Sequence, residues 1–217
     1  VPESIKVVFK GKPAPFVTGK DLILEIIRIL GVDGALYKAL EFTGDTIQYL
    51  SMDDRFSLCN MAIEAGAKNG IVAYDEITKE FLDSRESLRA EPKIHYSDAD
   101  AVYCQEIIID VEALNPVIAY PFLPSNGHSV NQAVEDNIRV DQVFIGSCTN
   151  GRLSDFKVAS EILKDKKVAR HVRLIVTPGT QKILRDAQKA GYIDILIDAG
   201  AVVSNPTCGA CLGGYMG

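Results

Sequence analysis

Hydrophobic and polar positions in the first half of the chain follow the periods of strands and helices. Residues 5–9 are apolar except for Lys6, and the segment ends at Gly-Lys-Pro, which predicts a strand. Between residues 21 and 30, leucine and isoleucine recur every three or four positions, which predicts an amphipathic helix. Ser51 with two acids just after it predicts the start of a helix that runs to about Ala65. Residues 70–74 predict another strand.

The second half alternates strands and helices after a charged stretch, residues 83–98, that contains Pro92. We predict strands near 103–111, 142–146 and 172–177, helices near 154–165 and 179–190, and a further apolar stretch at 194–203. This alternation is typical of a parallel α/β sheet. We therefore expect an α/β protein with two subdomains, residues 1–94 and 95–217.

Composition narrows the classes of function. The chain has 217 residues, 47% of them hydrophobic, and a net charge of −6. This acidic balance argues against nucleic acid as a partner. No apolar run reaches the roughly 18 residues that a membrane span needs, so no membrane segment is expected. Five cysteines, an odd number, suit a reducing compartment, and we expect a cytoplasmic protein.

Three cysteines carry the most specific chemical signal. Cys148 lies in I-G-S-C-T-N-G-R, and Cys208 and Cys211 lie in N-P-T-C-G-A-C-L-G-G. Cys148 is the second residue after the predicted strand 142–146, and the carboxyl ends of strands are where open α/β sheets bind ligands. Three thiolates can hold three corners of a cubane iron–sulfur cluster and leave one iron open to substrate.

The spacing alone leaves other interpretations open. A CxxC pair also occurs in zinc sites, and His171 or Cys104 could supply the fourth zinc ligand. The thiols could also hold no metal. A zinc-stabilised α/β module without catalysis is the main alternative.

The two cysteine motifs resemble those of the aconitase superfamily, most closely the branch of 3-isopropylmalate dehydratase and homoaconitase large subunits. Four more segments agree in order: L-C-N-M-A-I-E-A-G-A at 58–67, Y-C-Q-E-I-I-I-D-V at 103–111, H-S-V at 128–130 and V-T-P-G-T at 176–180. The D-S-H-T and N-R-N-F segments of the family are absent, and the chain starts at Val1. We therefore expect an internal fragment of a longer subunit.

The resemblance implies a fold, a cofactor and a reaction. The fold would have aconitase-like α/β/α layers with parallel or mixed sheets. One [4Fe–4S] cluster would be held by Cys148, Cys208 and Cys211, with the fourth iron open to substrate. The reaction would isomerise 2- or 3-hydroxy di- or tricarboxylic acids by dehydration and rehydration. A separate small subunit, carrying the swivelling domain, would supply the catalytic base and most of the pocket for the substrate side chain.

Asn60 and Glu64 are four residues apart in the predicted helix 51–65 and would share a face. Spacing alone favours an ordinary solvated face. The resemblance instead implies that both line the cluster site, where Glu64 would orient a water or hydroxide. Cys59 would point about 100° away around the helix and pack in the core.

Residues around Cys148 have weaker assignments. Ser147 and Asn150 could donate hydrogen bonds to cluster sulfurs or could only form a turn. Arg152 could attract a substrate carboxylate or pair with Asp155. Elsewhere, Cys104 is expected to be a structural thiol, and His128 matches a family position but could equally be an ordinary surface histidine.

Overall fold

The computed structural model describes residues 2–85 and 92–213. The chain divides into two compact units, Val1–Asp136 and Asn137–Gly217. Within the described residues, no helix is long and apolar enough to cross a membrane.

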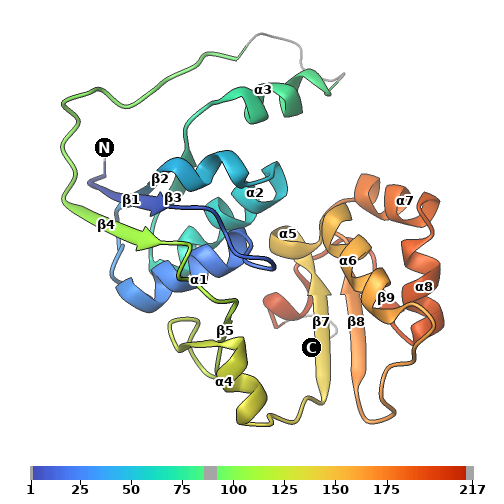
Figure 1. Cartoon of the computed structure of the whole chain (residues 1–217). Coiled ribbons are helices and arrows are strands. Elements are labelled where there is room, and N and C mark those ends of the chain that lie inside the picture. Colours follow the sequence, from blue (N-terminus) through green and yellow to red (C-terminus); the bar gives the residue numbers. More distant parts are fainter. Residues whose placement is uncertain (1, 86–91, 214–217) are drawn as a thin grey trace. The chain divides into compact units, whose positions relative to one another are not determined.

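Unit 1 is built on a four-stranded parallel sheet (Figure 1). Its strands are β1 (Ser4–Lys10), β2 (Ala39–Thr43), β3 (Asn69–Val72) and β4 (Gln105–Asp110), in the order β3-β2-β1-β4. Alternate residues of β1 are buried, which directs Ile5, Val7 and Phe9 into the core. The strand period that the sequence predicted therefore defines the core-facing side of this sheet.

Helices cover the buried face of this sheet. They are α1 (Gly19–Leu30), the 3-10 helix η1 (Asp45–Tyr49), α2 (Met52–Asn60) and the 3-10 helix η2 (Met61–Ala65). The apolar stripe of α1, including Leu22, Ile23 and Ile26, is fully buried. Ser51 caps α2 by accepting a hydrogen bond from the backbone N–H of Asp54 at 3.2 Å, as its position predicted.

The predicted single helix over 51–65 is wrong in its second half. The α-helix ends at Asn60, and the chain continues as η2 until Gly66, whose φ of 84° ends the helical segment. A 3-10 helix has three residues per turn, so residues four apart are no longer stacked. Asn60 and Glu64 therefore do not share a face as they would on a continuous α-helix.

A half-buried ion pair joins α2 to the next helix, α3 (Glu76–Asp83). Arg55 is only 2% exposed and donates two hydrogen bonds of 2.6 Å to the carboxylate of Asp75. It also donates to the carbonyls of Ile47 and Leu50. The guanidinium lowers the pKa of Asp75 to about 2, and Asp75 in turn caps α3 at the N–H of Thr78.

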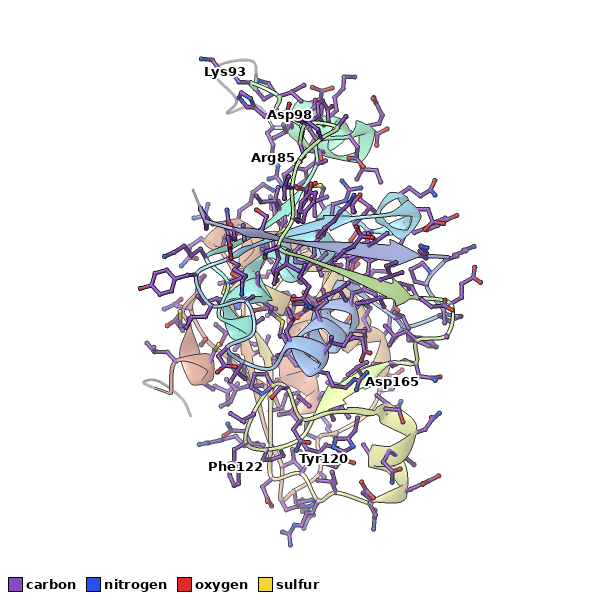
Figure 2. All side chains as sticks on the ribbon, turned by 90° about the vertical axis from the view of Figure 1, so that its left-hand side faces the viewer. Arg85, Lys93, Asp98, Tyr120, Phe122 and Asp165 are labelled. Carbon is purple, nitrogen blue, oxygen red and sulfur yellow. The ribbon has the colours of Figure 1, made fainter. Side chains whose placement is uncertain are left out.

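A small hairpin and a helix complete unit 1. Strands β5 (Val117–Ala119) and β6 (Gly127–Ser129) are antiparallel, and α4 (Val130–Glu135) follows. The buried Asp21 of α1 accepts a hydrogen bond of 2.7 Å from the N–H of Val117, which holds the hairpin against α1. Tyr120, just after β5, stacks on His128 of β6. Phe122, in the connection between the two strands, is fully exposed (Figure 2).

Unit 2 is a second parallel α/β unit. Its strands are β7 (Gln142–Gly146), β8 (Arg173–Thr177) and β9 (Val202–Val203), in that order. Its helices are α5 (Ser147–Asn150), α6 (Leu153–Leu163), α7 (Gln181–Lys189), α8 (Tyr192–Ala199) and the 3-10 helix η3 (Gly209–Cys211). Helices α6, α7 and α8 pack beside β8 around Phe156, Val176 and Leu196 (Figure 1).

The structure confirms the α/β class and the parallel sheets, but the compact units do not divide between residues 94 and 95. Strand β4 pairs with β1 over six residues, from Ile5↔Gln105 to Lys10↔Asp110, so the chain returns to the first sheet after the charged stretch. The division comes after Asp136 instead. Residues 86–91 of the predicted boundary stretch lie outside the described residues.

Candidate metal centre

The carboxyl ends of β7, β8 and β9 meet at one edge of the unit 2 sheet because the three strands are parallel. Cys148 is the second residue after β7, and Cys208 follows β9 by five residues. Cys211 ends η3. All three cysteines are exposed. All three cysteines therefore lie in segments that follow strands of this one parallel sheet.

The turn after β7 has a tightly restricted backbone. A Cβ on Gly146 would lie 2.0 Å from the carbonyl oxygen of Thr177, so no side chain fits there. Ser147 then adopts a φ of 64°, which is uncommon for a residue with a side chain, and it is 4% exposed. Cys148 follows in the single turn of α5. The backbone before Cys148 is thus tightly packed, whereas Cys148 itself is exposed.

Hydrogen bonds join the three loops at this edge. The N–H of Gly179, after β8, donates to the carbonyl of Gly151 at 2.9 Å. Thr177 and Ser204 share a buried hydrogen bond of 2.8 Å between their hydroxyls. These contacts connect the loop that carries Cys148 to the loop after β8, and the end of β8 to the segment that leads to Cys208.

Gly209 brings the CxxC turn onto the same edge. A Cβ at Gly209 would lie 3.2 Å from the ring of Phe144 on β7 and 3.6 Å from Oγ1 of Thr177 on β8. Its φ of 55° is also one that glycine adopts most easily. The turn between Cys208 and Cys211 therefore packs directly over β7 and β8.

Within residues 2–85 and 92–213, no three or more His, Cys, Asp or Glu side chains are gathered to hold a single metal ion. Of the two possible fourth zinc ligands, Cys104 belongs to unit 1 and His171 is exposed. A cubane cluster binds each cysteine through a different iron, so its ligands stand further apart than those of one ion.

Asn150 and Arg152 are held by Asp155 of α6. The amide nitrogen Nδ2 of Asn150 donates to Oδ1 of Asp155 at 3.1 Å, and the backbone N–H of Arg152 donates to Oδ2 at 2.9 Å. The guanidinium of Arg152 donates to the carbonyl of Cys148 at 3.0 Å. The amide nitrogen of Asn150 therefore donates to a carboxylate within its own loop and helix start, which agrees with the turn-forming role left open by the sequence.

The amide oxygen of Asn150 is buried and has no hydrogen-bond partner among the described residues. A buried acceptor of this kind is costly unless a donor is present. It can accept a hydrogen bond from a hydroxyl or a water, and it cannot donate to sulfide.

Asn60 and Glu64 lie in unit 1, and the three cysteines lie in unit 2. Asn60 is exposed at the end of α2, and Glu64 is half-buried in η2. Burial raises the pKa of Glu64, against smaller opposing effects of a backbone hydrogen bond and of the charge on Lys20. Its Oε2 atom is buried and lacks a hydrogen-bond partner in the described part of the chain.

The two remaining cysteines, Cys59 and Cys104, and His128 make contacts within unit 1. Cys59 packs against the unit 1 core, and burial raises the pKa of its thiol to about 11, as expected for a packed thiol. Cys104 is exposed and its sulfur donates to the carbonyl of Ser4 at 3.3 Å. His128 stacks on Tyr120 with ring centroids 4.2 Å apart.

Sequence reasoning missed Thr177, Ser204 and Phe144 as supports of this edge. A signal was present for the first two, because each polar residue directly follows an apolar strand-like run. Phe144 gave no signal, since its contact with Gly209 depends on the packed structure.

Comparisons with known proteins give one family match and relatives that share one name. A family model for the aconitase family (aconitate hydratase) matches residues 1–217. A protein of Aliarcobacter butzleri named 3-isopropylmalate dehydratase large subunit is 86% identical over all of this chain and 52% of its own length. Proteins of the same name from Sulfurimonas denitrificans and Wolinella succinogenes are 75% and 73% identical over the whole chain.

The chain spans about half the length of these curated relatives. The family match, in contrast, extends over every residue of the chain. The chain belongs to the aconitase family.

Proposed function

We propose that this chain is the iron–sulfur part of a hydro-lyase large subunit of the 3-isopropylmalate dehydratase type. The observation that carries the proposal is the placement of Cys148, Cys208 and Cys211 on loops at one edge of one parallel sheet. The names of the relatives support this branch. A homoaconitase large subunit is the alternative within the same family.

The residues at the edge fit a [4Fe–4S] cluster. An all-cysteine ligand set is typical of iron–sulfur centres, and three cysteines leave one iron without a protein ligand. Gly209 keeps side-chain bulk away from the CxxC turn. When bound, the cluster would supply a Lewis acid for the hydroxyl group that leaves the substrate. Cys148, Cys208 and Cys211 would hold it.

Glu64 and Asn60 would act on the substrate side. The raised pKa of Glu64 lets its carboxyl hold a proton closer to neutral pH than an exposed glutamate does, which suits proton transfer to and from water. The Asn60 amide, exposed at the end of α2, would orient polar groups of the substrate.

The proposed substrate is an anionic 2- or 3-hydroxy acid, isopropylmalate in the favoured case, in leucine biosynthesis. The proposed partner is a small subunit, since the relatives are named large subunits. We place no base for the carbon-bound proton of the substrate in this chain and assign that base to the small subunit. We propose the cytoplasm as the compartment, because exposed cluster-binding thiols need reducing conditions.

The test is anaerobic hydration of the unsaturated intermediate by the full-length large subunit assembled with its small subunit. Cys148→Ser should lower the rate at least about a hundredfold, and Cys104→Ser, an exposed cysteine of unit 1, should retain most of it. Equal loss in both variants, or full activity of Cys148→Ser, would refute the proposal.

A further inference from the structure

We infer that Asp155 is a positioning residue that fixes the loop of the cluster ligand Cys148. The inference rests on the proposed function for the identity of the ligand. Asp155 sits in the first turn of α6, where a carboxylate usually serves only to cap its own helix. Here its two oxygens accept hydrogen bonds from two different parts of the preceding loop.

The first of these bonds runs to the backbone. Oδ2 of Asp155 accepts from the N–H of Arg152 at 2.9 Å, which fixes the N-cap residue just before α6. From that residue the guanidinium reaches back and donates to the carbonyl of Cys148 at 3.0 Å. The start of the helix is thereby connected to the backbone of the ligand itself.

The second bond runs to a side chain. Oδ1 of Asp155 accepts from Nδ2 of Asn150 at 3.1 Å, two residues beyond Cys148. This bond has no capping role, because it satisfies no backbone donor of α6. The loop also bonds to itself and to the next strand end, through Gly151 N–H to the Ser147 carbonyl and Gly179 N–H to the Gly151 carbonyl.

The Cys148 loop is therefore held on both sides. One connection runs from Asp155 through Arg152 to the Cys148 carbonyl, and the other from Asp155 to Asn150. A bond to a charged carboxylate is stronger than one between neutral groups. The arrangement pre-positions the thiol, so that cluster binding does not have to order the loop. It also gives Arg152 a role in this chain that needs no substrate carboxylate.

The test uses the full 217-residue chain and four variants. Asp155→Ala removes both connections, Asn150→Ala removes only the one without a capping role, and Arg152→Gln removes the bond of the guanidinium to the Cys148 carbonyl. Val158→Gly is the matched control, because it weakens α6 at an exposed position in the middle of the helix. It leaves the hydrogen bonds of Asp155 in place. Urea unfolding measures how far each variant loses stability.

The first readout is hydrogen exchange of the amides of residues 147–152 in the metal-free chain. We expect at least tenfold faster exchange in Asp155→Ala and about fivefold in Asn150→Ala, with Val158→Gly within twofold of the unchanged chain. The second readout is the rate of iron loss to a chelator after anaerobic reconstitution with iron and sulfide, where the same order of variants is expected.

The two readouts separate the inference from the proposed function. If the exchange rates of residues 147–152 stay the same in both Asn150→Ala and Asp155→Ala, the positioning role of Asp155 is wrong. It is also wrong if Val158→Gly raises these rates as much as the other two variants do. If the chain without substitutions binds no iron, the proposed function is wrong. The exchange measurement would still decide whether Asp155 fixes the loop.

Discussion

The hydroxyl of Thr177, at the end of β8, lies 2.8 Å from the hydroxyl of Ser204, just after β9, and both side chains are buried. The backbone N–H of Ser204 also donates to the carbonyl of Val176 at 2.9 Å. This pair fixes where the chain leaves the sheet toward Cys208, so the geometry of the second cysteine motif depends on it.

Thr177→Val should therefore destabilise unit 2. Valine has nearly the same shape as threonine but removes one partner of a buried hydrogen bond, which costs about 1–2 kcal/mol. Urea unfolding monitored by circular dichroism measures the change. Thr207→Val is the control, because Thr207 is exposed and its hydroxyl accepts a long hydrogen bond of 3.3 Å from the N–H of Gly209. Equal stability of the Thr177 and Thr207 variants would contradict the importance of the buried pair.

Asp75→Ala should lower the free energy of unfolding by about 2 kcal/mol, since it leaves the buried guanidinium of Arg55 without its carboxylate partner. The control is the neighbouring Glu76→Ala, which removes an exposed ion pair with Lys79 and should change stability by less than about 0.5 kcal/mol. Urea unfolding compares the two variants. Similar losses in both would contradict this account of Arg55.

The same pair predicts a pH dependence. The folded pKa of Asp75 is about 2, below its ordinary value of 3.8, so its ionised form stabilises the fold. This contribution is present above about pH 4 and is lost as the pH falls toward 2. The difference in unfolding free energy between the unchanged chain and Asp75→Asn should shrink over that range. If this difference in unfolding free energy stays constant from about pH 5 to about pH 2.5, ionised Asp75 does not stabilise the fold.

Glu64→Gln should separate stability from activity. Burial raises the pKa of Glu64, so the ionised carboxylate at neutral pH opposes folding, and this effect grows as the pH rises through the folded pKa. Removing the charge should leave the chain equally stable or stabilise it by up to about 1 kcal/mol at pH 7. In the assembled two-subunit enzyme the same change should reduce turnover at least about a hundredfold.

The measurement for Glu64 is thermal unfolding of the chain beside initial rates of the assembled enzyme. Glu80→Gln, a change of the same type in an exposed residue of α3, serves as the control for both. A Glu64→Gln enzyme with unchanged turnover would remove this residue from the proposed site.

The chain alone should not turn over substrate. It spans about half the length of its curated relatives, and fast dehydration needs a base, a clamp for the substrate carboxylates and the metal centre placed together. The check is the anaerobic hydration assay with the reconstituted chain and no other subunit. Turnover comparable to that of the two-subunit enzyme would show that the chain is self-sufficient.

Much of the fold followed from local patterns. Strand β7 has the bounds predicted for it, because Val143, Phe144 and Ile145 form an apolar run that Gly146 ends. Strand β2 and the β5–β6 hairpin were missed because their strands are only three to five residues long. Helix α3 was missed although Asp75 and the spacing of Ile77 and Phe81 are typical of a capped amphipathic helix. The unit boundary was misplaced because a charged stretch marks a long connection, and sequence composition does not show that the next strand returns to β1.

The candidate site was only partly accessible from the sequence. Strand-end placement of Cys148 follows from an apolar run and a glycine break. The direction of the Asn150 amide does not follow from the sequence, because it depends on where the first turn of α6 places Asp155. The early end of α2 at Asn60 was likewise hidden, as Met-Ala-Ile-Glu-Ala suits an α-helix as well as η2.

The central claim is that Cys148, Cys208 and Cys211 bind one [4Fe–4S] cluster. The most direct measurement is the iron and acid-labile sulfide content of the chain after anaerobic reconstitution, with its visible absorption spectrum. We predict about four irons and four sulfides per chain, with most of both lost in Cys148→Ser, Cys208→Ser and Cys211→Ser and retained in Cys104→Ser. Binding of zinc in place of iron, or equal iron loss in Cys104→Ser, would contradict the account.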